Sequence, residues 1–539
     1  MSMLSVSGVR AFIKRHYYAW TGVLMWLSFP TYDTVYLSAF PLFAWFAFTP
    51  LLVYVRSASP REVFRASLVT GIIGITLLYN WIGQFGNKVP GGYTVILVVL
   101  MPVLALIFTT RIWGAEMLAR RFPALRWLIL PALWVIVDGV HSVGYLAFPW
   151  TYWGYSQYPV TPLIQLSSVT GIFGITFLLL CSNALIADAL VLLKESGWNA
   201  RSILGSPEAR RLAGLAIMVM ACMAWGTWRI NAVVPGKPEV IRVAMVQTCI
   251  DPWEEWHLNR FDFLRELKQQ TLKALEENPD LLIWSESATL ELISYDYANN
   301  RLNRFEQEVL ALAKNSGKPL VTGEIGVLDD IVGRRFHYQN NAVLIDGKGE
   351  VANTYSKIHL VPFGEWFPYS GLFPWVQRIS NDFGGSNFEP GSAPVLFKAP
   401  GKRFAPLICY EGIFFRLCRD YRRLGADFFV NIINLNWTDT YRGHMQGFAS
   451  AKFRAVENGI WFLSAGNSGL TATVDPLGRV TASMPILTKG FLAADVDFSL
   501  NRETIYSLVG DLVLHFSLLF IGALIALVAV RRIRGENGA

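Results

Sequence analysis

Residues 404–411 read Phe-Ala-Pro-Leu-Ile-Cys-Tyr-Glu, and they join an apolar strand to a reactive side chain. The pattern predicts a buried strand over 404–409, followed by a helix over 413–424. Cys409 therefore lies at the carboxyl end of a strand, where its thiol reaches the rim of a sheet and the N-terminus of the next helix favours the thiolate. The Tyr410 backbone N–H beyond it is placed to meet an oxyanion. The alternative is a buried, inert cysteine, the commoner fate of a free thiol.

Strand-like and helix-like segments alternate around this stretch, between residues 239 and 500. The strands are expected at 239–247, 280–284, 319–325, 341–346, 350–355 and 427–433, and a hairpin at 460–465 and 469–474 closes the domain. Helices are expected at 254–277, 302–315, 413–424 and 443–458. Interleaved helices together with hairpins predict an α/β layered sandwich with mixed sheets.

Three more ionisable residues end strand-like segments in this region. Glu286 follows the strand 280–284 and could act as a general base, or it could be a solvated loop acid or a helix-cap partner. Lys357 follows the strand 350–355 and could stabilise an oxyanion, or it could lie on the surface. Glu365, which follows Phe363-Gly364, could orient Lys357 or Glu286, or it could form a salt bridge at the rim of the site. Each signal is weak alone, but the order Glu, Lys, Cys at three strand ends favours a shared site.

The rest of the chain reads as membrane protein. Of the 539 residues, 53% are hydrophobic and only 16% are charged, against about 25% in soluble domains. This composition excludes disorder, and five cysteines in a chain of this length exclude a disulfide scaffold. Eight apolar runs long enough to be considered as spans lie at 16–30, 35–55, 66–84, 92–113, 127–145, 162–192, 211–231 and 507–530.

Basic residues set the expected orientation of these spans. They cluster before the first span, in alternate loops at 56–65, 111–126 and 194–211, and after the last span at 531–534. By the positive-inside rule both termini are cytoplasmic, and the domain between the seventh and eighth spans lies on the outer side. We expect a transmembrane domain over 1–234, a catalytic domain over 235–500, and an anchor with a basic tail over 501–539. In this setting the net charge of +7 reflects cytoplasmic loops and indicates no nucleic acid partner.

Common catalytic motifs are missing from the sequence. It has no phosphate-binding loop, dinucleotide fingerprint, G-x-S-x-G elbow, H-E-x-x-H or paired C-x-x-C. ATP-driven transport, nicotinamide chemistry, serine hydrolysis and zinc hydrolysis therefore have no motif support.

The combination of Glu286, Lys357 and Cys409 resembles the nitrilase (carbon–nitrogen hydrolase) superfamily, whose Glu-Lys-Cys triad lies on an α-β-β-α sandwich. Within it, the eight-span layout and several phrases resemble the bacterial apolipoprotein N-acyltransferase family. These phrases are Phe148-Pro-Trp150, Gly154-Tyr-Ser-Gln157, Lys357-Ile-His-Leu-Val-Pro-Phe-Gly-Glu365 and Ile408-Cys-Tyr-Glu411. The resemblance covers nearly the whole chain.

The resemblance implies roles for single residues. Glu286 matches the general base, Lys357 the oxyanion-stabilising lysine and Cys409 the nucleophile. Glu365 and Glu411 match supporting acids, Tyr410 supplies its N–H, and Trp256 resembles an aromatic residue at the substrate entrance. Two departures stand out: Ser285 replaces the usual Pro before the catalytic Glu, and Asn434-Leu-Asn-Trp-Thr438 replaces N-D-x-W-F. The second departure puts details of substrate binding in doubt.

The implied reaction moves a fatty acyl chain from a phospholipid, through a cysteine thioester, to the amino group of the N-terminal S-diacylglyceryl cysteine of an apolipoprotein. It requires no metal or cofactor, and it places the protein in the bacterial cytoplasmic (inner) membrane, with its catalytic domain on the periplasmic side. The apolar segment 366–376 would suit an arm that dips into the lipid headgroups, or a core-packing loop.

Two other classes stay open on the sequence. A membrane-tethered amidase of the same triad would hydrolyse C–N bonds in small substrates, although it would not need so large a membrane domain. A transporter or membrane scaffold would use the outer domain only for binding, but the spans hold few ionisable residues, among them Asp138 and Asp188. Pairing of Cys249 with Cys418 cannot be read from the sequence.

Overall fold

The protein is described by a computed structural model covering residues 16–30, 40–83, 96–144, 146–232, 236–251, 256–330, 335–366, 388–436 and 440–534. The chain forms two compact units. The first comprises residues 1–143, 151–229 and 509–539, and the second comprises 144–150 and 230–508. The short loop 144–150 thus belongs to the second unit, although the sequence analysis assigned it to the transmembrane domain.

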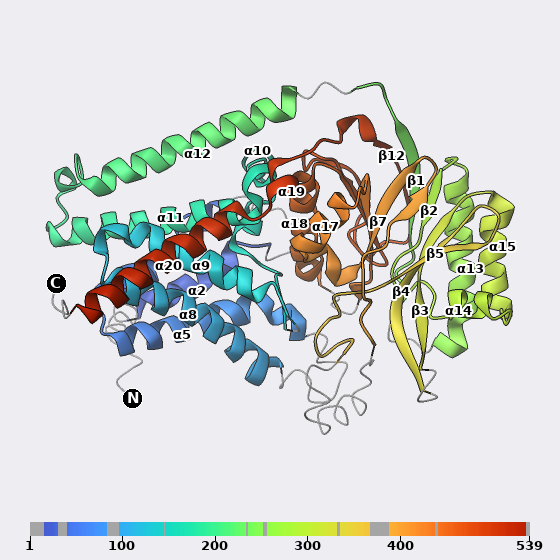
Figure 1. The fold of residues 1–539 in the computed structure, drawn as a ribbon, viewed down its shortest axis with the longest axis horizontal. Helices are drawn as coiled ribbons and strands as arrows, with labels where there is room; N and C mark the ends of the chain where they lie inside the picture. Colours follow the sequence, from blue (N-terminus) through green and yellow to red (C-terminus); the bar gives the residue numbers. More distant parts are fainter. Residues whose placement is uncertain are drawn as a thin grey trace, which may run out of the picture. The chain divides into compact units, whose positions relative to one another are not determined.

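The first unit is helical (Figure 1). Its α-helices are α2 (Trp20–Leu27), α3 (Phe40–Phe43), α4 (Thr49–Val55), α5 (Pro60–Tyr79), α8 (Met101–Ala119), α9 (Arg126–His141), α10 (Thr161–Ile164), α11 (Ser167–Glu195), α12 (Pro207–Ala232) and α20 (Leu512–Ile533). Within the described ranges, six helical stretches are long and apolar enough to cross a membrane: 60–82, 97–119, 123–141, 167–195, 207–232 and 512–533.

These six stretches coincide with six of the eight predicted spans, so the prediction of a multi-span helical membrane protein is confirmed. The other two predicted spans, 16–30 and 35–55, fall on the short helices α2, α3 and α4, and residues 31–39 lie outside the described residues. A count of eight therefore stays a prediction.

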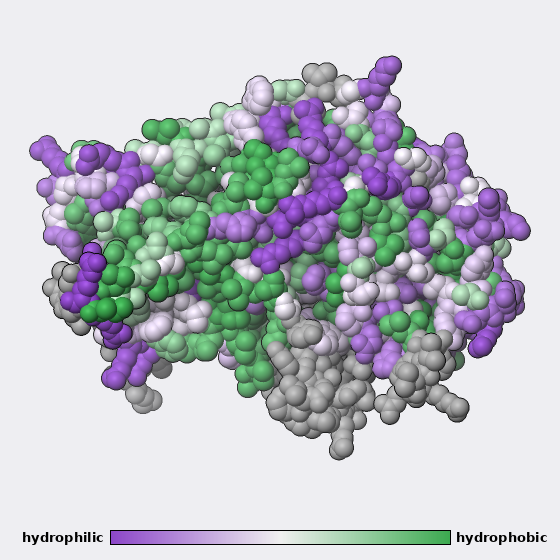
Figure 2. Space-filling view, in the orientation of Figure 1, coloured by the Kyte–Doolittle hydropathy of each residue, from purple (hydrophilic) through white to green (hydrophobic). Residues whose placement is uncertain are grey.

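Local sequence explains how these helices begin and pack. Ser59 caps α5, accepting from the Glu62 backbone N–H while the Glu62 carboxylate accepts from the Ser59 N–H, and Pro60 occupies the first turn. Helix α2 approaches α5 closely, because a Cβ on Gly22 would lie only 2.9 Å from the Gly74 backbone nitrogen. Apolar side chains of α20 stay exposed, and Figure 2 shows hydrophobic surface over this helix, as contact with lipid requires.

The second unit contains two six-stranded sheets. The first has the order β12-β1-β2-β3-β4-β5, with bounds Gly490–Asp497, Val240–Gln247, Leu281–Ile283, Leu320–Asp330, Arg335–Ile345 and Val351–Ser356. The second has the order β11-β10-β9-β8-β7-β6, with bounds Val480–Ser483, Ala472–Val474, Trp461–Gly466, Phe428–Ile433, Lys402–Ile408 and Phe397–Ala399.

Each sheet has three parallel strands flanked by antiparallel ones: β1, β2 and β3 in one, and β7, β8 and β9 in the other. Helices connect the parallel strands, and those described are α13 (Trp256–Leu275), α14 (Ile293–Ala298), α15 (Arg304–Ser316), α17 (Phe415–Arg423) and α18 (Tyr441–Asn458). The sheets face each other through β1 with β9 and β4 with β7, with helices outside (Figure 1). The predicted α-β-β-α sandwich is confirmed.

One fold prediction is wrong. The hairpin at 460–465 and 469–474 does not close the domain, because β11 and β12 follow it. Strand β12 pairs antiparallel with β1 along its whole length, from Val240 opposite Asp497 to Gln247 opposite Gly490. A contact between segments about 250 residues apart in the sequence leaves no local signal in the pattern of either strand.

Candidate active site

The three predicted catalytic residues all follow strands. Glu286 comes three residues after β2, Lys357 directly after β5 and Cys409 directly after β7. Strands β2 and β5 run in the same direction, because β2 is parallel to β3 and two antiparallel steps lead from β3 through β4 to β5. Their carboxyl ends therefore meet at one edge of the first sheet.

Lys357 is buried between two carboxylates. Its side chain is fully covered, and its Nζ lies 3.3 Å from Glu286 Oε1 and 2.7 Å from Glu365 Oε1. Burial by itself lowers the pKa of Lys357, but Glu286 and Glu365 outweigh that effect and raise the pKa above its usual value. Lys357 is therefore a buried, positively charged group. The alternative that it lies on the surface is excluded.

Asn340, on β4, was missed by the sequence analysis. Its Nδ2 donates to Glu286 Oε1 (2.9 Å) and to Glu365 Oε1 (2.8 Å), so it holds the two acids in place beside Lys357. The Val361 backbone N–H donates to the other oxygen of Glu365 (2.8 Å). The available signal was the run Gln-Asn-Asn at 339–341, which directly precedes the apolar end of the strand at 342–345.

Glu286 is also held from the second sheet. The Asn434 backbone N–H, one residue beyond β8, donates to Glu286 Oε2 (3.0 Å). The turn after Glu286 has Ser287 at φ +56° and packs on β3 at Gly323, where a Cβ would lie 2.8 Å from the Ser287 backbone nitrogen. Glycine at 323 therefore allows the Glu286 turn to approach the sheet.

Cys409 directly follows β7 and is the first residue of the 3-10 helix η9 (Cys409–Ile413). Its φ of +52° is uncommon for a residue with a Cβ, so the half-buried Cys409 is held at a strained position. Burial of the site, followed by the charge of Glu286, raises the pKa of Cys409 well above its usual value, and Lys357 only partly offsets this. The resting cysteine is a thiol that needs a base.

Glu411 ties the cysteine turn to the lysine segment. It is fully buried and accepts from Tyr355 Oη (2.7 Å), from the backbone N–H groups of Ile358 and His359 (2.7 and 3.2 Å), and from that of Ile408 (2.9 Å). Burial raises the pKa of Glu411 to about 7, and these donors limit the rise. The residue braces the site without facing solvent.

Tyr410 packs on the loop 144–150. Its hydroxyl donates to the Ala147 carbonyl (2.7 Å), and its ring stacks with Phe148 and Trp150. The phrase Phe148-Pro-Trp150, singled out in the sequence, thus forms part of the surroundings of the cysteine turn.

Trp256 begins α13, and its ring packs on Phe263 and Phe305. Its indole N–H donates to Glu291 Oε1 (3.0 Å), which also accepts from Arg260 (3.1 Å). A role for Trp256 at the substrate entrance stays a prediction. Segment 367–376 of the apolar arm, and Trp437 and Thr438 of the altered loop, lie outside the described residues. Cys249 and Cys418 are both free thiols.

A cavity of about 230 Å³ lies beside the lysine segment. Its lining is almost entirely apolar: Gly144, Ala147, Ile358, His359, Leu360, Trp366, Pro390 and Phe414. The His359 ring stacks on Phe414 with ring centres 3.9 Å apart and planes within 3° of parallel. Burial lowers the pKa of His359 to about 4, so the cavity wall is uncharged at neutral pH.

His359 makes stability depend on pH. Because its folded pKa is about 4 and a histidine in the unfolded chain titrates near 6.5, only the unfolded state gains a proton as the pH falls below 6.5. We expect this to cost the wild type about 2 kcal/mol at pH 5 relative to pH 7.5. His359→Phe keeps the stack and removes the titration, so thermal unfolding at both pH values should show the variant gaining relative to the wild type at pH 5. An equal difference at both pH values would contradict this.

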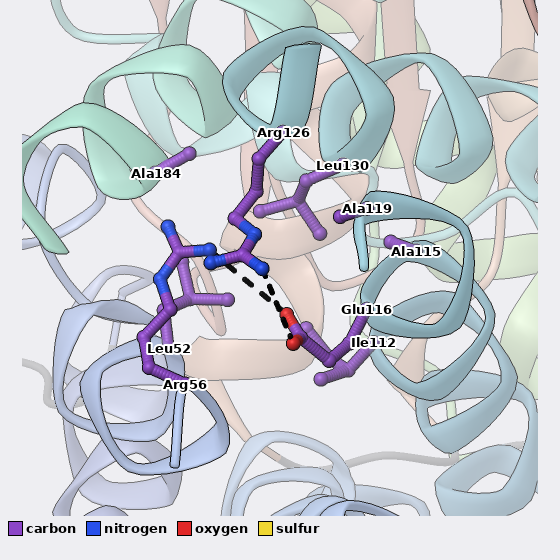
Figure 3. A pocket seen from close by; sticks show the side chains of 9 residues that line it. All are labelled: Leu52, Arg56, Ile112, Ala115, Glu116, Ala119, Arg126, Leu130 and Ala184. Atoms are coloured by element: carbon purple, nitrogen blue, oxygen red, sulfur yellow. Dashed lines mark ion pairs between the residues drawn. The ribbon is translucent and has the colours of Figure 1, made fainter. Parts of the chain in front are cut away.

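The first unit holds its own buried charges. Figure 3 shows Arg56 and Arg126 directed toward Glu116, with the closest N to O distances 4.0 and 3.6 Å. Arg56 also pairs with Asp188, and Arg111 with Asp138. Asp138 and Asp188, two of the few ionisable residues in the predicted spans, are therefore each paired with an arginine, and helix-to-helix bracing explains their presence there.

The fold and the site together define a membrane-bound enzyme of the carbon–nitrogen hydrolase class. Residues 242–506 match the family model described as carbon-nitrogen hydrolase, and residues 21–185 match that of the apolipoprotein N-acyltransferase N-terminal domain. The chain is 30% identical to apolipoprotein N-acyltransferase of Geobacter metallireducens over 519 residues, covering 95% of this chain and 94% of the relative. It belongs to the apolipoprotein N-acyltransferase family and is an acyltransferase.

A second relative agrees with this assignment. The apolipoprotein N-acyltransferase of Borreliella burgdorferi is 26% identical over 508 residues, covering 92% of each chain. Among solved structures, an amidase from Nesterenkonia sp. is similar at 19% identity with a TM-score of 0.35, covering 50% of this chain and 96% of the amidase.

Proposed function

We propose that this enzyme transfers a fatty acyl chain from a phospholipid to the N-terminal amine of an S-diacylglyceryl apolipoprotein, through a thioester on Cys409. The observation that carries the proposal is the buried Lys357, fixed between Glu286 and Glu365 at the strand ends and electrostatically coupled to the Cys409 thiol. Membership of the family supplies the class of donor and acceptor.

In the first half-reaction, Glu286 takes the proton of the Cys409 thiol and the sulfur attacks the ester carbonyl of the phospholipid. Lys357 and the Tyr410 backbone N–H stabilise the oxyanion of the tetrahedral intermediate. As the C–O bond breaks, the protonated Glu286 returns its proton to the leaving alkoxide. A lysophospholipid departs and a Cys409 thioester remains.

In the second half-reaction, the neutral amine of the lipoprotein attacks the thioester carbonyl. Glu286 takes the amine proton, the C–S bond breaks, and the thiolate recovers a proton from Glu286. The products are an amide and the free enzyme, so the scheme is ping-pong. Water must be excluded between the two steps, because hydrolysis would discharge the thioester.

The surroundings of the site support a lipid donor. Ile358 and His359, which line the apolar cavity together with Phe414, directly follow Lys357 in the chain. An acyl chain that extends from the reacting carbonyl into this cavity would meet uncharged surroundings. We further propose that the enzyme lies in the bacterial inner membrane with the second unit on the periplasmic side. The basic clusters in alternate loops support this orientation.

The proposal is tested with detergent-purified enzyme, a phospholipid carrying a labelled acyl chain, and a synthetic diacylglyceryl lipopeptide. We expect label on the peptide amine, one lysophospholipid released per peptide acylated, and parallel lines in double-reciprocal plots of the two substrates. An N-acetylated lipopeptide is the control, and it should accept no label. Hydrolysis of simple amides without acyl transfer would replace the proposal with a tethered amidase.

A further inference from the structure

Beyond the residues already discussed, a buried asparagine sits where three strands end. Asn467 directly follows β9 and is 3% exposed. Its backbone N–H donates to the Ile433 carbonyl at the end of β8 (2.8 Å), and its carbonyl accepts from the Cys249 N–H beyond β1 (2.8 Å). One residue thus links the turns that follow β1, β8 and β9.

The side chain of Asn467 is fully satisfied and its orientation is fixed. Oδ1 accepts from the Ile250 N–H (3.1 Å) and from Thr248 Oγ1 (3.2 Å), while Nδ2 donates to the Ile250 carbonyl (2.7 Å) and to Asn434 Oδ1 (3.2 Å). A backbone N–H can only donate, so the oxygen must face Ile250 N and the amide cannot flip.

The contact with Asn434 leads to the general base. Asn434 Oδ1 accepts from Asn467 Nδ2 and from the Asn436 N–H (3.2 Å), which fixes the Asn434 side chain on one side. On the other side its backbone N–H donates to Glu286 Oε2. Asn436 adds a bond from its Nδ2 to the Ile250 carbonyl (3.0 Å), so the altered loop is joined to the same turn.

We propose that Asn467 is a positioning residue for this reaction. Its hydrogen bond to the Asn434 side chain keeps the Asn434 backbone N–H on the Glu286 carboxylate. The inference rests on the proposed role of Glu286 as general base. It goes beyond that role by naming the hydrogen bonds that position the Glu286 carboxylate. The chemical contribution of Asn467 is indirect, since it acts through Asn434.

The readout is the rate constant of Cys409 acylation at saturating phospholipid, together with the phospholipid concentration at half saturation, measured in single turnovers with the full chain in mixed micelles of phosphatidylethanolamine and phosphatidylglycerol. Without the Asn434 N–H the Glu286 carboxylate is no longer held in the position from which it takes the thiol proton, so the acylation step slows while phospholipid binding is unaffected. Lys357, Glu365 and Cys409 are unchanged in the variants.

For Asn467→Ala we expect the rate constant of acylation to fall about tenfold while the half-saturating phospholipid concentration changes little. Asn501→Ala is the matched control, because Asn501 also braces a turn in the same unit by donating to a carbonyl, that of Asp427 (2.7 Å). Its rate constant should stay at the wild-type value. A folded Asn467→Ala enzyme with a wild-type rate constant would overturn the proposal.

If Asn467→Ala does not fold, Asn434→Ala gives the same test. It removes Asn434 Oδ1, which accepts from Asn467, and keeps the backbone N–H that donates to Glu286. We expect the same loss of rate, and a wild-type rate constant would overturn the proposal. Where both fold, the double variant should lower the rate constant no further than either single one; losses that multiply would show that Asn467 does not act through Asn434. Glu286→Gln distinguishes a failure of the Asn467 proposal from a failure of the proposed function. Wild-type acylation by Glu286→Gln would overturn the proposed function itself.

Discussion

A Cys409→Ala enzyme is expected to lose acyl transfer by a factor of roughly 10⁴ or more, because no other group can form the thioester. Cys409→Ser is expected to fail similarly, since a hydroxyl gives up its proton far less readily than a thiol. The measurement is the steady-state transfer of a labelled acyl chain to a diacylglyceryl lipopeptide.

Cys249→Ala is the matched control for this change. Cys249 is also half-buried, belongs to the same unit and has a positive φ of +54°, so the two alanine variants meet similar backbone demands. The Cys249 variant should keep near-wild-type activity. Equal losses in both variants would point to damage of the fold, and substantial activity in Cys409→Ala would remove the cysteine from the mechanism.

The second large effect is expected at Lys357. Lys357→Met removes the cation between Glu286 and Glu365 and leaves two buried carboxylates sharing one amide donor, Asn340. Breaking a buried ion pair in this way costs about 3–5 kcal/mol of the free energy of unfolding. Loss of the oxyanion partner should also slow acylation of Cys409 by a factor of about 10²–10³.

A double variant separates these two effects. Lys357→Met combined with Glu365→Gln removes one of the opposed charges, so the thermal midpoint should recover much of its loss. The rate of acylation should stay low, because the oxyanion still lacks its cation. Recovery of the rate together with stability would show that Lys357 serves only to hold the fold.

The sequence predicted the sandwich because its local signals agree with its tertiary structure. Apolar strands such as 404–408 and 428–433 are buried on both faces, so their composition alone marks them. Glu286 and Cys409 were visible because they follow such strands, β2 and β7, whereas Lys357 follows the alternating strand β5. The pairing of β12 with β1 was not visible, since it depends on a contact across the whole domain.

The positioning roles of three asparagines were not predicted, for a different reason. Asn340, Asn434 and Asn467 hold groups from segments that are distant in the sequence, so their partners leave no local signal. Hydrophobicity also marks the apolar segments 16–30 and 35–55, but the described helices α2 and α4 within them have only eight and seven residues, so these two spans stay a prediction. Short helices with apolar surroundings give the same composition as a single span.

The most direct test of the account is the intact mass of the purified enzyme after incubation with phospholipid alone. The account predicts a gain of one fatty acyl chain, located by peptide mapping on Cys409, absent in Cys409→Ala and discharged on addition of a diacylglyceryl lipopeptide. Folded wild-type enzyme that transfers acyl groups between the two substrates without ever carrying one would contradict the thioester mechanism.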